Sequence, residues 1–207
     1  LGYNALSDDF VYHDLSRMMI FTGNHDTERL GDLVRGDLGR AKIAMTLLAT
    51  LRGIPQIFAG DELLFRSADL SQGHGGLRVD FPGGWDGDAV DLFDPAQRQG
   101  AQGALFDHTR RLFNWRKSKP VIHSGRTLHF AARDNTYAYF RYDDSDAVFV
   151  FVNNSRGRKH VPWSHYAEIT ASLASEGRDV LTGRPVVVDD STLVPPRSAL
   201  VVEFKRL

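Results

Sequence analysis

Two short apolar runs in the first part of the chain each lead into a glycine and then into polar residues that carry carboxylates. The first run covers residues 17–22 and leads into 23–26, and the second covers 56–59 and leads into 60–62. Uninterrupted apolar runs of this length are typical of strands buried on both faces of a parallel sheet. Between them, apolar residues at helical spacing predict a helix over 39–52. The pattern therefore predicts a strand, helix, strand unit with polar loops at the carboxyl ends of both strands.

The pattern changes further along the chain. Residues 61–99 are rich in glycine and form a far longer connection than the usual about 4–6 residues. A helix is predicted over 102–117, and Pro120 marks its end. Beyond Pro120, turn residues separate short alternating segments, which predict a small antiparallel β-sandwich. We place a domain boundary there, between residues 1–119 and 120–207. Its strands are expected at 127–131, 136–142, 147–152, 179–181, 186–188 and 199–204.

Composition limits the classes of molecule that the chain is expected to bind. The 207 residues are 42% hydrophobic and 25% charged, as in an ordinary globular protein, and 25 Lys and Arg against 26 Asp and Glu offer no basic surface for nucleic acid or anionic lipid. No apolar run reaches about 18 residues, so we expect no membrane span. The absence of cysteine excludes disulfides, thiolate zinc sites and cysteine nucleophiles. It leaves periplasmic, extracellular and cytoplasmic locations open.

Two motifs carry a resemblance to a known family. Residues 21–26 read Phe-Thr-Gly-Asn-His-Asp, and residues 53–62 read Gly-Ile-Pro-Gln-Ile-Phe-Ala-Gly-Asp-Glu. They resemble the strand-seven and strand-eight motifs of the alpha-amylase family, glycoside hydrolase family thirteen, with Phe58 in place of a tyrosine. The resemblance continues through Trp115-Arg116 and residues 194–199 and covers nearly the whole chain. Residues 24–29 and 81–85 look most like the neopullulanase and cyclomaltodextrinase branch.

The resemblance implies an α/β plus all-β fold, namely the last two strands and helices of a TIM (β/α)8 barrel followed by the antiparallel β-sandwich. A complete barrel needs about 250 residues, so we expect this chain to be the C-terminal part of a longer protein. The implied activity is retaining hydrolysis of alpha-glucosidic bonds in maltodextrin, cyclodextrin or pullulan-type glucans. Retaining hydrolysis needs a nucleophile and an acid/base carboxyl about 5–5.5 Å apart. The resemblance places both upstream of Leu1.

Several further expectations follow from that placement. The isolated chain should be inactive. Its exposed strand edges should favour self-association of the fragment. A homo-oligomer of the longer parent protein is the alternative form of self-association. The expected partner is an alpha-glucan oligosaccharide or polysaccharide. A rival interpretation from a different class is a noncatalytic protein, binding glycans or other partners, that keeps the amylase-like architecture without the activity.

By resemblance, the family's third catalytic carboxylate maps onto Asp26, which would hydrogen-bond sugar hydroxyls in the distorted, oxocarbenium-like state. His25 maps onto the neighbouring substrate-binding histidine, and Asn24 would orient the turn. Each has an ordinary structural alternative. An aspartate in this position is also a good helix N-cap, and His25 could be a hydrogen-bonded core histidine.

The long loop supplies three more candidate sugar contacts. Phe81 and Trp85 could present aromatic faces to sugar rings, or could simply fold the loop onto the barrel. Arg78 could hydrogen-bond sugar hydroxyls, or could form a solvated surface pair with Asp80. Glu62 matches the family motif, and we expect it to brace the barrel end.

No metal or other cofactor is expected. Calcium in the parent is conceivable, because four aspartates follow one another closely in the loop, but their spacing lacks the glycine and terminal glutamate of an EF-hand. The histidines other than His25 are scattered, without the close pairs typical of zinc sites, so they are expected to be ordinary surface or core residues. They are His13, His74, His108, His123, His129, His160 and His165. The aspartates are Asp86, Asp88, Asp91 and Asp94.

Overall fold

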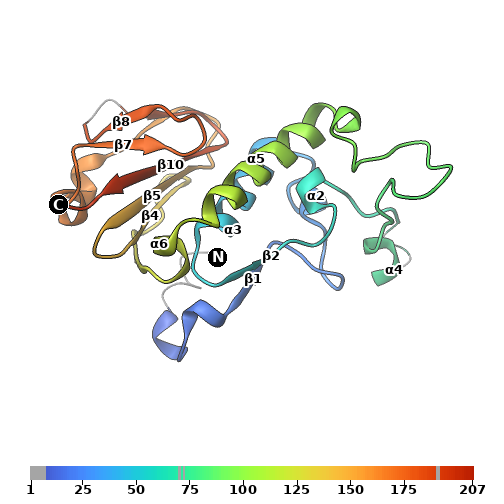
Figure 1. Cartoon of the computed structure of the whole chain (residues 1–207), viewed down its shortest axis with the longest axis horizontal. Helices are drawn as coiled ribbons and strands as arrows, with labels where there is room; N and C mark the ends of the chain where they lie inside the picture. The colour runs from blue at the N-terminus through green and yellow to red at the C-terminus, as the bar shows by residue number, and fades with distance from the viewer. Residues whose placement is uncertain (1–7, 70, 72, 190–191) are drawn as a thin grey trace.

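The computed structural model describes residues 8–69, 71, 73–189 and 192–207. Figure 1 shows two parts joined side by side. Helices α3 (Leu38–Thr50) and α5 (Gly100–Arg116) lie beside a short parallel sheet, and an antiparallel sheet lies at the C-terminal side. The long loop with α4 (His74–Leu77) extends away from the antiparallel sheet. Within the described residues, no helix is long and apolar enough to cross a membrane.

The predicted strand, helix, strand unit is confirmed. Strand β1 (Met19–Phe21) runs parallel to β2 (Ile54–Gln56), and α3 connects them after the short helix α2 (Leu30–Leu33). The Asp37 side chain accepts a hydrogen bond from the Arg40 amide at 3.0 Å, so it caps α3. At the other end, Gly53 has φ +100°, a conformation that favours glycine and allows the chain to turn into β2.

Two details of the sequence prediction are wrong. The strands are shorter than expected, and residues 57–59 lie beyond β2. Burial on both faces also fails, because Met19 is 58% and Ile54 55% exposed. The physical reason is that, in the described part of the chain, each of these strands has only the other as a neighbour and no further strand or helix covers those side chains.

Helix α5 confirms the prediction for 102–117 and packs along α3. Buried Leu105 lies in one cluster with Ala41, Met45 and Leu48 of α3. The chain then continues through α6 (Pro120–His123), whose first position is Pro120, where a missing N–H costs nothing. Short 3-10 turns described before α6 include η1 (Asp9–Val11), η2 (Leu15–Arg17), η3 (Asp61–Leu63) and η5 (Pro95–Gln97).

The C-terminal part is a six-stranded antiparallel sheet of order β3-β4-β5-β10-β7-β8, with a small β6–β9 ladder beside it, which confirms the antiparallel β prediction. The predicted strand at 179–181 is displaced, because the sheet pairs 176–179 instead. Turn η6 and helix α7 follow β6. The bounds are β3 (Arg126–His129), β4 (Thr136–Tyr142), β5 (Asp146–Asn153), β6 (Lys159–His160), η6 (Trp163–Tyr166), α7 (Ala167–Thr170), β7 (Glu176–Asp179), β8 (Pro185–Val187), β9 (Leu193–Val194) and β10 (Ser198–Lys205).

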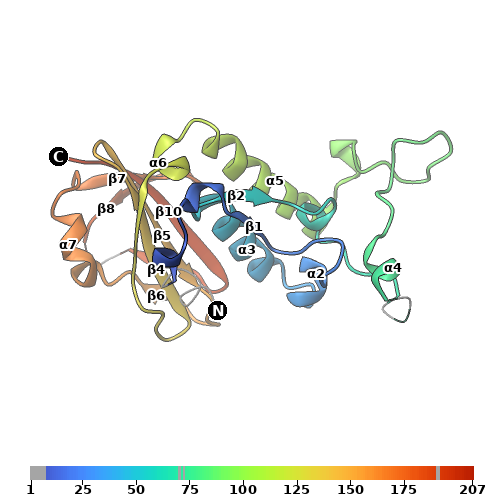
Figure 2. The same cartoon turned by 90° about the horizontal axis from the view of Figure 1, so that it is seen from below.

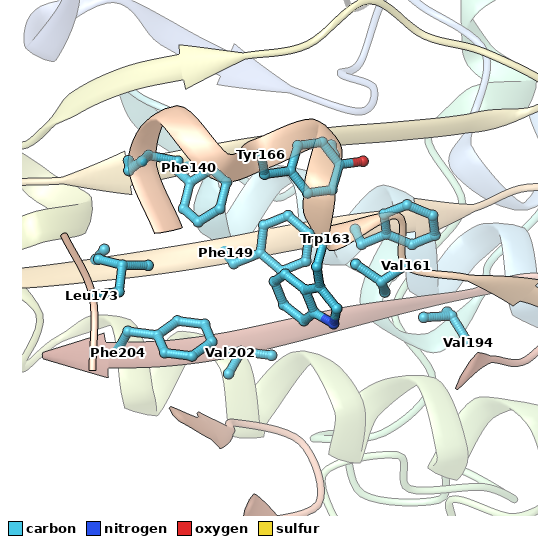
Figure 3. Packing of buried hydrophobic residues seen from close by; sticks show 13 residues of the cluster. Phe140, Phe149, Val161, Trp163, Tyr166, Leu173, Val194, Val202 and Phe204 are labelled. Atoms are coloured by element: carbon cyan, nitrogen blue, oxygen red, sulfur yellow. The ribbon is translucent and has the colours of Figure 1, made fainter. Parts of the chain in front are cut away.

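Both faces of this sheet are buried along β5 and along most of β4. One face packs an aromatic cluster under η6, in which Phe149 lies 4.8 Å from Trp163 and 5.3 Å from Tyr166 between ring centroids (Figure 3). On the other face, Val150 shares a cluster with Ile43 of α3 and Leu112 of α5. Figure 2 shows both helices on that side of the sheet. One hydrophobic core therefore includes residues from both sides of residue 120. The domain boundary at that residue stays a prediction.

Candidate active site

A tight turn follows β1 and projects Asp26 outward. The Asn24 side-chain oxygen accepts a hydrogen bond from the Asp26 amide at 2.9 Å, and the Asn24 amide donates to Thr27 Oγ1 at 2.8 Å. These two bonds fix the backbone on either side of Asp26, as expected for an asparagine that orients the turn. The turn therefore presents the Asp26 carboxylate at the carboxyl end of β1.

Three cationic or ionisable side chains surround that carboxylate. Arg78 Nη2 lies 3.1 Å and His74 Nδ1 3.2 Å from Oδ1, while His25 Nε2 lies 3.2 Å from Oδ2. Arg78 also donates from Nε to the His25 carbonyl at 3.3 Å. All four side chains are roughly half exposed, so these ion pairs contribute little to folding stability. The Asp26 carboxylate therefore remains accessible to solvent, with three potential hydrogen-bond donors beside it.

The ordinary alternatives for this turn are wrong. The residue at the N-terminus of α2 is Arg29, and the cap of α3 is Asp37, so Asp26 caps neither helix. The His25 side chain is 61% exposed and is no core histidine. Arg78 pairs with Asp26, and in the described structure no contact joins it to Asp80. The structure thus places Arg78, a candidate sugar contact from the long loop, beside Asn24, His25 and Asp26.

A buried ion pair lies behind the turn. Arg29 is 1% exposed and places Nη1 3.2 Å from Oδ1 of Asp61, which follows β2 and is fully buried. Burial raises the pKa of Asp61 to about 6, and the Arg29 charge opposes that rise. The second Asp61 oxygen has no hydrogen-bond partner among the described residues. Neighbouring Glu62 accepts a hydrogen bond from the Gly60 amide at 2.9 Å, so its carboxylate shapes the turn after β2, and its bracing of the barrel end stays a prediction.

The aromatic candidates lie apart from this cluster. Phe81 packs inward, with ring centroids 5.6 Å from Phe65 and 4.7 Å from Phe93, so folding the loop accounts for its position. Trp85 is 82% exposed and lines an open depression of about 560 Å³ together with Phe81, Phe93 and Asp88. Neither Asp26 nor any of the three side chains around it lines that depression.

Three of the four aspartates considered for calcium form hydrogen bonds in local turns. Asp88 accepts a hydrogen bond from the Trp85 amide at 3.1 Å. Asp91 accepts one from the Phe93 amide, and Asp94 accepts one from the Ala96 amide, both at 2.9 Å. Across the described residues, no group of three or more His, Asp or Glu side chains is placed to hold a metal ion. These carboxylates therefore have a structural use in shaping the loop.

Two residues of the site were missed from the sequence. His74 was grouped with the scattered histidines, although it lies within 3.2 Å of Asp26. Its position between glycines in a long functional-looking loop was the available signal. Arg29 carries no local sign of burial, because its partners are backbone carbonyls from other loops.

Comparisons with known proteins agree with this architecture. The sequence profile described as "Alpha amylase, catalytic domain" matches residues 5–162, and that described as "Cyclo-malto-dextrinase C-terminal domain" matches residues 127–203. A beta/alpha-amylase of Paenibacillus polymyxa is 29% identical over 160 residues, covering 72% of this chain and 11% of the relative. A cyclomaltodextrinase of Geobacillus thermopakistaniensis (strain MAS1) is 26% identical over 184 residues, covering 84% of this chain and 27% of the relative.

Solved structures show the same fold. An alpha-amylase from Geobacillus thermoleovorans, complexed with acarbose, gives a TM-score of 0.68 at 21% identity, covering 98% of this chain and 42% of that chain. The enzyme AmyP in complex with maltose gives a TM-score of 0.74 at 20% identity, covering 97% of this chain and 43% of that one. The chain thus spans less than half of these relatives. Because the catalytic-domain profile matches more than half of its residues, the chain belongs to the alpha-amylase family, with part of the catalytic barrel followed by a cyclomaltodextrinase-type C-terminal domain.

Proposed function

We propose that this chain is part of a retaining glycoside hydrolase that acts on alpha-glucosidic bonds of maltodextrin, cyclodextrin or pullulan-type glucans. The observation that carries the proposal is the Asp26 carboxylate, which stands half-exposed at the end of β1 with Arg78, His74 and His25 within 3.2 Å. Family membership and the cyclomaltodextrinase and amylase names of its relatives support the substrate class.

Asp26 would act as the third carboxylate of the site. A carboxylate oxygen can accept hydrogen bonds from two neighbouring sugar hydroxyls, and these bonds strengthen as the ring flattens toward the oxocarbenium-like state. Arg78 and the two histidines keep that carboxylate oriented and offer donors to the same sugar. Asn24 fixes the turn, and Trp85 offers an exposed aromatic face farther along the loop.

The nucleophile and the acid/base come from elsewhere in the full-length protein. Of the two carboxylates that follow β2, Asp61 is buried against Arg29 and Glu62 accepts a hydrogen bond from the Gly60 amide. Neither is free to form a glycosyl-enzyme intermediate or to protonate a leaving oxygen. We therefore propose that the 207-residue chain is inactive by itself.

The test is an assay of the full-length protein on starch, pullulan and cyclodextrins, measuring released reducing sugar. Hydrolysis of at least one of these glucans with retention of the anomeric configuration is the expected result. Binding of the same glucans without any release of reducing sugar would instead identify a noncatalytic glycan-binding protein.

A further inference from the structure

One buried guanidinium lies directly behind the Asp26 turn. Arg29 donates from Nε to the Leu77 carbonyl at 2.8 Å and from Nη1 to the Ala59 carbonyl at 2.7 Å, besides its contact with Asp61. Its guanidinium carbon also lies 4.0 Å from the ring centroid of Phe58. A side chain that is 1% exposed thus has its donors aimed at acceptors from two other loops.

These contacts tie the two segments that build the site to the loop after β2. Arg29 stands three residues after Asp26, Ala59 and Asp61 belong to the loop after β2, and Leu77 belongs to α4. Helix α4 begins at His74, and Arg78 follows its last residue. Both residues contact Asp26. Because Arg29 donates to the Leu77 carbonyl of α4, it contacts the same helix that positions these two side chains.

We infer that Arg29 is a positioning residue that sets the place of Asp26 relative to His74 and Arg78. The inference rests on the proposed function of Asp26. Surface ion pairs between half-exposed side chains are too weak to hold this geometry by themselves. The contacts of a buried arginine with two carbonyls and a carboxylate are strong enough, because removing the arginine would leave each of these partners as an unsatisfied buried group.

Arg116 offers a matched control. It is also buried, at 7% exposure, and donates to the Ala49 carbonyl at 2.7 Å and the Gly53 carbonyl at 2.9 Å. Gly53 lies immediately before β2, at the opposite end of that strand from Ala59 and Asp61. Arg116→Met therefore removes a comparable buried guanidinium without touching the Asp26 site.

The experiment compares Arg29→Met, Arg29→Lys, Arg116→Met and Asp26→Asn in the full-length enzyme. Both methionine variants should lower Tm, but Arg29→Met should lower kcat by about 10-fold to 100-fold with KM changed less than about 3-fold, since misplacement of a positioned group acts on the transition state. Arg116→Met should keep kcat within about 2-fold. Arg29→Lys keeps a cationic side chain but not the planar set of guanidinium donors, and its kcat should fall by about 10-fold.

A second readout is amide hydrogen exchange on the 207-residue chain. Arg29→Met should speed exchange at residues 24–27 and 77–78, and Arg116→Met should leave those amides unchanged. Wild-type kcat in folded Arg29→Met would overturn the inference, as would equal kcat losses in both methionine variants. If Arg29→Met does not fold, wild-type kcat in Arg29→Lys overturns it. An unchanged kcat in Asp26→Asn would instead refute the proposed function, so the two failures are distinguishable.

Discussion

His108 should make the chain less stable in mild acid. Its ring lies between α5 and α3, where Nε2 is 2.9 Å from Thr46 Oγ1 and 3.1 Å from the Lys42 carbonyl. Since the Thr46 hydroxyl itself donates to the Lys42 carbonyl at 2.8 Å, it can accept from a protonated Nε2 of the neutral ring. Burial, assisted by the Lys42 charge, lowers the pKa of His108 from 6.5 to about 4.

The sign and size of the effect follow from that pKa. The depressed folded-state value means that stability is fully present above the unfolded-state pKa of about 6.5 and is lost as the pH falls toward 4. Each pKa unit corresponds to about 1.4 kcal/mol, so moving from pH 7.5 to 4.5 should cost about 2–3 kcal/mol from this residue.

The assay is urea unfolding of the 207-residue chain at pH 7.5 and 4.5, with His108→Gln as the comparison. Glutamine keeps a side-chain N–H donor and does not titrate in this range. Asp61 acts in the opposite direction, because burial raises its pKa to about 6 and its ionisation above that pH disfavours folding. It is present in both proteins and cancels. Equal losses of stability in wild type and His108→Gln would refute the reasoning.

Three further outcomes are expected. Tyr139→Phe removes the 2.6 Å hydrogen bond to Thr50 that joins α3 to β4, and should cost about 1 kcal/mol in urea unfolding, whereas a cost near zero would mean that the bond does not stabilise this junction. Trp85→Ala should change the free energy of unfolding by less than about 0.5 kcal/mol but weaken glucan binding by the full-length protein. Phe81→Ala should lower the free energy of unfolding by about 2 kcal/mol or more, because its ring packs against Phe93. A larger loss of stability in Trp85→Ala than in Phe81→Ala would contradict the placement of these two rings. The purified 207-residue chain should release no reducing sugar from maltodextrin, and release that Asp26→Asn abolishes would show that it holds a complete site.

The regular elements were predictable because their signals are local. Residues 39–52 and 102–117 carry apolar side chains at helical spacing between residues that cap or stop a helix, and both helices are present. Strand β4 was predicted residue for residue. The turn that follows it is fixed by Asp143, whose Oδ1 accepts the Ser145 and Asp146 amides at 2.9 Å each.

The remaining features depend on contacts between distant segments. Strands β6 and β9 have two residues each, too few for any periodicity to show. The motif located Asp26 and His25, but His74 lies 48 residues away from Asp26 along the chain, in a loop whose path no spacing rule gives. The burial of Arg29 likewise depends on carbonyls that only the folded loops bring together.

The most direct test of the central claim is the turnover of Asp26→Asn in the full-length enzyme, measured on maltodextrin or cyclodextrin. Asp107→Asn is the control, since Asp107 is also an exposed aspartate paired with an arginine, at 3.3 Å from Arg110 on the surface of α5. The account predicts that Asp26→Asn lowers kcat by about 10²-fold or more, with a smaller change in KM, because its hydrogen bonds strengthen chiefly in the transition state. Asp107→Asn should leave both constants unchanged. A kcat for Asp26→Asn equal to that of the wild type would contradict the catalytic role of this carboxylate.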